Sequence, residues 1–300
     1  MKNNVYVRSN RSIQTISLTR MVLLLPMIIY GIYKNGIYLY MHHYCGVMGL
    51  FKPIIIIFGG ALIGALVNII YEYIFKHSKD SLLSILFSSF HIEYGLIIGC
   101  LMSININVYL YFIILFIGLF ISKFVKNRVN IMALIFIIIY ILQSKMFGGF
   151  SYINAYESSK VFSYEFMDYM IGRGVGGIAT THIILLIIAL FGMYVTNNNK
   201  NHISLVSILT IILLFAFYSI YSNHPFIPLI FAYNYLFICS YVATDFVTSC
   251  YTVKGTILYG SIVGILLFGF YFLNPILAPY IAILIASVLN NLIDRKVNKS

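Results

Sequence analysis

The chain has 300 residues, of which 61% are hydrophobic and only 9% are charged, and its net charge is +11. A soluble domain averages about 25% charged residues and could not bury this much apolar surface, so soluble and disordered classes are excluded. The 19 basic residues lie between long apolar runs, which is typical of a membrane topology signal and argues against a nucleic-acid-binding protein.

Ten apolar segments are long enough to cross a bilayer core of about 30 Å as helices. We therefore expect an all-α, polytopic membrane protein with about ten transmembrane helices. In chain order, the predicted spans lie near residues 21–42, 53–75, 82–103, 107–124, 131–147, 176–196, 203–222, 225–247, 255–273 and 275–293.

The basic residues predict how these spans are oriented. With ten spans, both chain termini lie on the same side of the membrane. If that side is cytoplasmic, 14 Lys and Arg residues lie inside, Arg20 and Lys200 among them, and 5 lie outside, Lys34 among them, which together account for all 19. This split agrees with the positive-inside rule, so we expect a multi-pass protein with cytoplasmic N- and C-termini.

The spans divide into two halves of five helices, and an odd number per half makes the halves inverted relative to each other. The third span of each half carries polar sequence, at Glu93 and at Asp245. Inverted repeats with broken helices near the middle of the membrane are a transporter-like design. The predicted parts are a cytoplasmic N-terminal segment (1–20), a first half (21–147), an outer-face loop (148–175), a second half (176–293) and a cytoplasmic tail (294–300).

The outer-face loop is the long connection in this scheme, and the residues around it include three of the eight acidic residues, Glu157, Glu165 and Asp168. Long loops in compact proteins often carry function. A solvated connection without a function is an equally good interpretation, so the sequence leaves the role of this loop open.

Three acidic residues fall within or at the end of predicted spans, where a carboxylate is costly and by default marks a site. Glu72 lies four residues before Lys76, which favours an ion pair on one helix face at the membrane surface. Glu93 lies deeper, and the sequence does not assign its role. Asp245 either caps the end of its span or belongs to a half-helix whose backbone is satisfied by nearby hydroxyl side chains. The hydroxyl residues are Thr244, Thr248 and Ser249.

A glycine-rich stretch, residues 172–182, opens the sixth predicted span. Glycines before a helix N-terminus expose backbone N–H groups, which suits an anionic ligand such as a phosphate. Close helix packing explains glycines there about as well. The candidate residues in this stretch are Gly176, Gly177 and Thr181.

Three stretches of the chain together resemble one family of membrane proteins. The first is the basic start and first span, residues 7–33; the second is the GGIATT turn at 176–181; the third is ATDFVTS at 243–249, followed by TVKG at 252–255. They are similar to the RnfD proteins of the Rnf electron-transport complexes and to the related NqrB proteins of the sodium-pumping NADH:quinone oxidoreductases, together the RnfD/NqrB family. The resemblance extends over nearly the whole chain, and ten helices is also that family's number.

The resemblance implies an integral membrane component of an ion-translocating ferredoxin or NADH oxidoreductase complex in the bacterial plasma (inner) membrane. Its implied partners are the other subunits of the membrane electron-transport complex and the lipid bilayer, with no nucleic acid. The family carries FMN or riboflavin. The resemblance therefore implies that two groups of residues hold a flavin or line the coupling path. These are Thr244, Asp245, Thr248 and Ser249 in the third stretch, and Gly176, Gly177 and Thr181 in the second.

The family attaches FMN through its phosphate to a threonine in an outer-face loop, within a D-x-x-S/T-G-A-T motif. That motif is not found here, and the chain has no threonine between Thr19 and Thr180. Thr180 and Ser158 are the fallback candidates for a covalent FMN. The alternatives are a small-solute or ion transporter or channel, or a redox-silent structural component, on the same scaffold. The sequence assigns no catalytic residue and no metal site.

Overall fold

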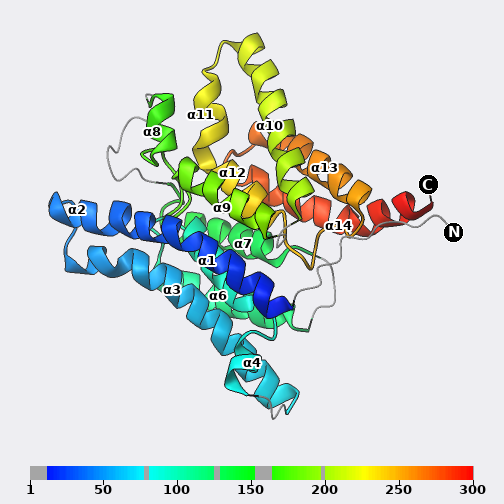
Figure 1. The fold of residues 1–300 in the computed structure, drawn as a ribbon. Coiled ribbons are helices and arrows are strands. Elements are labelled where there is room, and N and C mark those ends of the chain that lie inside the picture. Colours follow the sequence, from blue (N-terminus) through cyan, green and yellow to red (C-terminus); the bar gives the residue numbers. More distant parts are fainter. Residues whose placement is uncertain (1–11, 78–80, 125–128, 153–163, 197–199, 300) are drawn as a thin grey trace. The chain divides into compact units, whose positions relative to one another are not determined.

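The computed structural model describes residues 12–77, 81–124, 129–152, 164–196 and 200–299. These residues form helices and no strand, which confirms the all-α class (Figure 1). Four helical segments among them have the length and composition to cross a membrane, and several further apolar helices are shorter. More than one such segment is what a polytopic membrane protein requires. The count of ten spans stays a prediction. The four segments are Ile13–Met41, Val47–Phe75, Asn201–Ser222 and Val253–Tyr271.

By their contacts, the helices group into two compact units. The first unit comprises Arg11–Lys126 and Ile138–Gly192, and the second includes Asn127–Ile137 and Met193–Ser300. The helices of the first unit are α1 (Ile13–Ile32), η1 (Tyr33–Ile37), α2 (Tyr38–Met41), α3 (Val47–Ile70), η2 (Tyr71–Phe75), α4 (Leu82–Leu86), α5 (His91–Leu101), α6 (Val108–Ser122) and α8 (Phe166–Met170). Those of the second are α10 (Asn201–Ser222), α11 (Phe226–Phe231), η3 (Ala232–Asn234), α12 (Tyr235–Phe237), η4 (Ile238–Val242), α13 (Val253–Tyr271) and α14 (Ala278–Lys299). Two helices, α7 (Ile131–Met146) and α9 (Ile183–Val195), contribute residues to both.

The first unit is built on close contact between α3 and α5. Gly60 of α3 and Gly95 of α5 face each other, and a Cβ on either one would overlap the backbone carbonyl of the other. One turn along α3, Gly64 lies against the carbonyl group of His91 in the same way. Small residues let membrane helices approach until their backbones touch, which gains dispersion energy without any hydrophobic driving force between helices. The glycines of α3 thus place α5, with its polar N-terminal turn, directly against α3.

The second unit is built on α10, α13 and α14, with α13 packing against both of the others. Gly260 of α13 lies against the backbone of Ile203, and Gly264, one turn later, lies against Thr210. Aromatic side chains fill one end of this unit, where Phe215 stacks on Tyr235 with ring centroids 6.1 Å apart. The same small-residue packing therefore recurs in both units.

Both predicted third spans are interrupted in the structure. In the first unit, α4 ends at Leu86 and α5 begins only at His91. In the second unit, Tyr233 and Asn234 adopt left-handed φ angles of 59° and 65° between α11 and α12. Breaks of this kind free backbone N–H and C=O groups that the membrane cannot hydrate, so other protein groups must satisfy them. The two halves as inverted repeats stay a prediction.

Two predicted span boundaries are wrong in an informative way. Hydropathy predicts that the sixth span begins at residue 176, but α9 begins at Ile183. Residues 176–182 are not helical, and the backbone N–H groups of Ile178 and Ala179 donate to carbonyls at the C-terminal end of α5. Hydropathy also extends the eighth span to residue 247, but η4 ends at Val242. The first error falls on sequence that is buried without being helical, and the second on a non-helical turn in which Val247 is 47% exposed. Hydropathy alone cannot distinguish either from a span.

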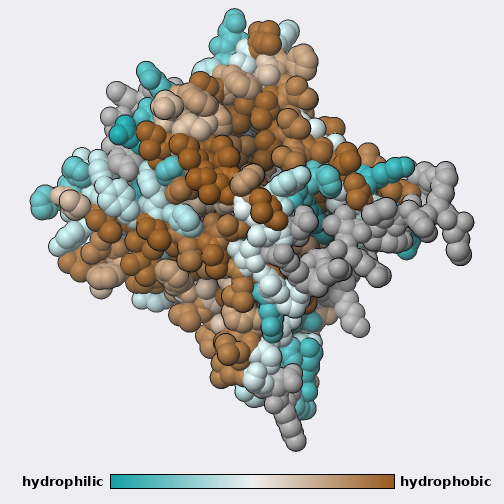
Figure 2. Space-filling model, viewed as in Figure 1, coloured by the Kyte–Doolittle hydropathy of each residue, from teal (hydrophilic) through white to brown (hydrophobic). Residues whose placement is uncertain are grey.

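Hydrophobic residues cover much of the visible outer surface of the long helices, as Figure 2 shows. Large apolar side chains on α1, α3 and α10 are exposed, among them Ile29, Leu62 and Phe217, which are 67%, 65% and 71% exposed. Water would not tolerate apolar patches of this extent on a monomer, so these faces contact lipid or other protein.

Candidate functional site

Two non-helical segments contain the residues that the sequence singles out. Residues 172–182 precede α9 in the first unit, and residues 243–252 connect η4 to α13 in the second. Gly176, Gly177 and Thr181 lie in the first segment, and Thr244, Asp245, Thr248 and Ser249 lie in the second. All seven are buried.

The second segment, residues 243–252, is organised by the Asp245 side chain. Its Oδ2 accepts hydrogen bonds from the backbone N–H and the hydroxyl group of Thr248, at 3.2 and 2.6 Å. The Ser249 hydroxyl donates to the Asp245 carbonyl, and the Thr244 hydroxyl donates to the Ser240 carbonyl at 2.6 Å. The structure therefore joins Asp245, Thr248 and Ser249 in one local network, while the Thr244 hydroxyl bonds separately to the carbonyl four residues earlier; in both cases side chains satisfy backbone groups.

Asparagines from α14 and from the start of α7 complete this network. Asn130 Nδ2 donates to the carbonyl of Val242, the last residue of η4, at 2.9 Å. Asn290 Nδ2 donates to the carbonyl of Thr248 at 2.6 Å. The last carbonyl groups of a helix have no intrahelical partner, and burial makes an unsatisfied one costly. These amides therefore permit η4 to end inside the unit.

Lys200 also donates hydrogen bonds to the second segment. It is the N-cap residue of α10, is only 3% exposed, and extends its Nζ toward residues 246–249. Nζ donates to the carbonyls of Phe246 and Ser249 at 3.2 and 3.0 Å, and to the Ser249 hydroxyl at 2.9 Å. It also lies 4.6 Å from the centre of the Tyr251 ring. The topology pattern places Lys200 in a loop on the cytoplasmic face and gives no sign of this role.

The first segment, residues 172–182, supplies backbone donors to the end of α5. The backbone N–H of Ile178 donates to Met102 O at 2.9 Å, and that of Ala179 donates to Cys100 O at 3.1 Å. Gly177 fits against the Cys100 carbonyl, where a Cβ would come within 2.7 Å of the oxygen. These N–H groups point into the protein, which is the arrangement expected from close packing. Whether the segment also binds an anion stays a prediction.

Lys34 donates hydrogen bonds to the first segment, as Lys200 does to the second. It lies in η1, is 1% exposed, and donates through Nζ to the carbonyls of Gly172 and Gly174 at 2.7 and 2.6 Å. The Thr181 hydroxyl lies 3.2 Å from the same atom. Gly172 has a φ of +86°, a conformation that glycine adopts at no steric cost. The topology pattern places Lys34 on the outer side, whereas the structure buries it within a helix that continues to Met41.

The break between α4 and α5 has its own polar network. Asn68 Nδ2 donates to the Leu86 carbonyl at 2.7 Å, and Ser89 Oγ donates to Asn68 Oδ1 at 2.7 Å. Lys123 Nζ donates to Ser89 Oγ at 2.9 Å, and His91 lies within hydrogen-bonding distance of the same oxygen. A lysine therefore lies at this break too, although its contact here is a side-chain oxygen.

Glu93 forms an ion pair that the sequence did not reveal. Its Oε1 lies 2.9 Å from Arg20 Nε, and both side chains are almost fully buried. The span pattern assigns Arg20 to the cytoplasmic N-terminal segment, but α1 begins at Ile13 and carries it inside the first unit. The other pairing prediction is confirmed: Lys76 Nζ lies 2.9 Å from Glu72 Oε1 at the end of the α3–η2 helix.

The acidic residues near the predicted outer-face loop have structural partners where they are described. Glu165 and Asp168 form a capping box at the start of α8, and Asp168 also pairs with Arg173 at 3.2 Å. Glu157 lies outside the described residues. The two described acidic residues therefore stabilise the start of the short helix α8, which gives both carboxylates a structural role.

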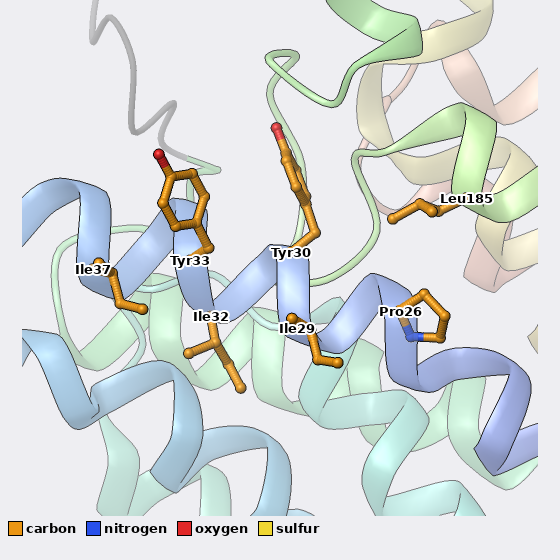
Figure 3. A pocket seen from close by; sticks show the side chains of 7 residues that line it. All are labelled: Pro26, Ile29, Tyr30, Ile32, Tyr33, Ile37 and Leu185. Atoms are coloured by element: carbon orange, nitrogen blue, oxygen red, sulfur yellow. The ribbon is translucent and has the colours of Figure 1, made fainter.

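An apolar groove of about 670 Å³ runs along α1 in the first unit (Figure 3). Tyr30 and Tyr33 project from the same side of the helix, and Leu185 of α9 faces them. Tyr30 also contacts the first segment, because its ring meets His182 edge-on with centroids 4.6 Å apart. The volume is within the range of sites for small organic ligands. The other lining residues are Pro26, Ile29, Ile32 and Ile37.

The described fallback candidate for a covalent FMN, Thr180, is packed inside the first segment. Thr180 is 4% exposed, so its hydroxyl cannot carry a bulky phosphodiester without opening the packed first segment. Ser158 lies outside the described residues. The first segment as it is packed therefore does not support a covalent flavin.

A family model described as the NQR2, RnfD, RnfE family matches residues 1–300. No curated protein sequence matches the chain. The family match covers both units and both non-helical segments described above.

Proposed function

The chain belongs to the NQR2, RnfD, RnfE family, and on this premise we propose that it is the integral membrane component of an Rnf-type ion-translocating electron-transport complex and that its broken helices line the coupling path. Family membership by itself makes it a membrane subunit of Rnf- and Nqr-type complexes in general. The finer proposal, a role in ion coupling, rests on the buried polar groups at the helix breaks.

The network around Asp245 is the observation that carries this proposal. Asp245 is 3% exposed, lies just beyond the end of η4, and is held by Thr248 through two hydrogen bonds. Ionisable groups inside membrane proteins are expensive and typically mark ion or proton pathways. Non-helical backbone is tolerated at membrane depth only where protein buries it or where it lines a cavity. A path for an ion past residues 243–252 would account for both features.

Ion movement per electron measures this role directly. The complex containing Asp245→Asn would be reconstituted into proteoliposomes, and Na⁺ and H⁺ movement would be measured with electron transfer in the same vesicles. The variant keeps the size of the side chain and one acceptor oxygen, so we expect assembly and electron transfer to persist while ion movement falls at least tenfold. Asp168→Asn is the matched control, because that carboxylate caps α8.

Unchanged ion movement per electron in the Asp245→Asn complex would refute a coupling role for residues 243–252. Ion or solute flux that persists without any electron donor would also contradict the proposal. That second outcome would identify the chain as a transporter or channel on the same scaffold.

A second role, retention of a non-covalent flavin, is favoured by the apolar groove on α1. The groove has the volume for an isoalloxazine ring and presents the two aromatic side chains Tyr30 and Tyr33. A flavin bound there would supply one- and two-electron chemistry, and the protein would supply position and surroundings. Aromatic rings prefer offset stacking or edge-to-face contact, which this lining offers.

Flavin content distinguishes this role from a purely structural one. We expect flavin absorbance that bleaches on reduction in the purified complex, and no fluorescent band from this chain after denaturation. Tyr33→Leu should lower the flavin content several-fold, whereas Tyr109→Leu, at a tyrosine that is 81% exposed, should not. A fluorescent band at the mass of this chain would overturn our interpretation of Thr180. Equal flavin content in the two variants would exclude the groove as the binding place.

A further inference from the structure

Lys34 and Lys200 each donate to the same kinds of oxygen atom, one lysine in each unit. Each ammonium group is nearly fully buried and donates to two backbone carbonyl oxygens and one hydroxyl oxygen. The six distances lie between 2.6 and 3.2 Å. In both cases the oxygens come from a non-helical segment. Lys34 lies in η1, and Lys200 directly precedes α10. We call the two sets of three oxygens the Lys34 cage and the Lys200 cage.

The cages have the donor set of a small-cation site. Neutral carbonyl and hydroxyl oxygens are the groups that replace the hydration shell of alkali cations in selective sites. These carbonyl groups are available because residues 172–174 and 246–249 lie in turns between helices. Their partial negative charges would repel one another in a low-dielectric interior unless a positive charge lay between them. The lysine ammonium supplies that charge, and Tyr251 adds the face of an aromatic ring to the Lys200 cage.

We propose that each cage is a binding site for a monovalent cation and that the tethered lysine ammonium is its resident ion. A cage emptied by shortening the lysine would then bind a free ammonium or methylammonium ion. This inference goes beyond the role in the complex: it describes two cation sites that exist in the chain with or without electron transfer. It also implies that a coupling ion cannot enter either cage while the lysine is in place.

Chemical rescue tests the proposal. The full chain carrying Lys34→Ala or Lys200→Ala would be purified in detergent micelles, and its thermal unfolding would be followed in ammonium, methylammonium or choline chloride at equal ionic strength. Loss of three charge-assisted hydrogen bonds should lower Tm by about 5–10 °C. Ammonium and methylammonium should restore at least half of the loss in a saturable manner. Choline, which is too large and has no N–H group, should restore none.

The hydroxyl ligands provide the matched controls. Lys34→Ala combined with Thr181→Val, and Lys200→Ala combined with Ser249→Ala, should bind methylammonium several-fold more weakly than the single variants. Lys145→Ala, at an exposed lysine in the last turn of α7, should change Tm little and respond equally to all three salts. Parallel titrations with KCl and NaCl show whether an emptied cage binds any small monovalent cation or only cations with N–H donors. Recovery of Tm with either kind of cation supports the proposal.

Failure of all monovalent cations to stabilise the alanine variants, or equal stabilisation by choline, would overturn the proposal. If the alanine variants do not accumulate, Thr181→Val still decides the matter for the Lys34 cage, since it retains the lysine. It should lower Tm in the otherwise native chain, because it removes one ligand of a resident cation. An unchanged Tm would show that this hydroxyl oxygen does not bind the ammonium group.

Discussion

The Arg20 and Glu93 side chains form an ion pair that is almost completely removed from solvent, with Nε and Oε1 2.9 Å apart. Transferring each charge from water costs several kcal/mol, and the mutual attraction offsets this cost only while both partners are present. The cost of losing one partner is therefore much larger than the net contribution of the pair. Few residues in the chain should be as sensitive to a single substitution.

Arg20→Met should destabilise the chain by about 3–5 kcal/mol, because it leaves the Glu93 carboxylate buried without its guanidinium partner. The double variant with Glu93→Gln should recover at least half of the loss, since it removes the buried charge. Chemical unfolding in micelles measures both. Arg173→Met, whose pair with Asp168 is largely exposed, should cost less than about 1 kcal/mol. A double variant as unstable as Arg20→Met would contradict a buried pair.

At the scale of helices, glycine positions decide how closely α3 and α5 approach. Gly60, Gly64 and Gly95 each contact the backbone of the opposite helix, where a Cβ would overlap it. Gly269 of α13 differs, because a Cβ there would meet nothing within 4 Å. Sequence alone cannot separate these two kinds of glycine, since both occur at apolar helical positions.

Gly64→Ala should therefore separate α3 from α5 and lower the free energy of unfolding by about 2 kcal/mol or more, in the range of overpacked cores. Gly269→Ala should leave stability unchanged or raise it by up to about 1 kcal/mol, since alanine favours a helix interior over glycine. Thermal and chemical unfolding of the two variants in the same detergent provide the comparison. Similar losses in both would mean that α3 and α5 do not pack through Gly64.

At the scale of the whole molecule, the buried basic residues change the number of Lys and Arg residues that indicate which side of the membrane a loop is on. Arg20, Lys34 and Lys200 are each at most 3% exposed and serve internal contacts, so they no longer report on membrane sides. Without them the predicted split of 14 inside and 5 outside becomes 12 inside (14 − 2) and 4 outside (5 − 1). The positive-inside rule still favours cytoplasmic termini with this smaller set.

Side-specific labelling tests that orientation. In a cysteine-free background, Ser9→Cys and Ser300→Cys should react with a membrane-impermeant maleimide only in inverted vesicles. Ser158→Cys should react in intact cells, because residues 148–175 are predicted to lie on the outer face. Labelling of residues 9 and 300 from opposite sides would require an odd number of spans and would exclude the ten-span scheme.

Hydropathy by itself determined the fold class and most helix positions. The predicted spans 107–124 and 131–147 correspond within two residues to α6 and α7. The motif around Asp245 was also found from its letters, because its hydroxyl residues act on groups three or four positions away. Contacts over three or four positions can be read from the spacing of residue types. The three stretches that resemble the family were enough to indicate it, and the family model confirms it.

Only the tertiary structure decided what the buried charges do. Lys34 contacts Gly172 and Thr181 across 138 and 147 positions of sequence, and Lys200 reaches Ser249 across 49. In the sequence each lysine resembles any basic residue that flanks an apolar run. Its partners are mostly backbone carbonyls, which every residue possesses and which only the breaks at 172–182 and 243–252 make available. The physical reason is that such a contact depends on where helices end in space, and no pattern of residue types records this.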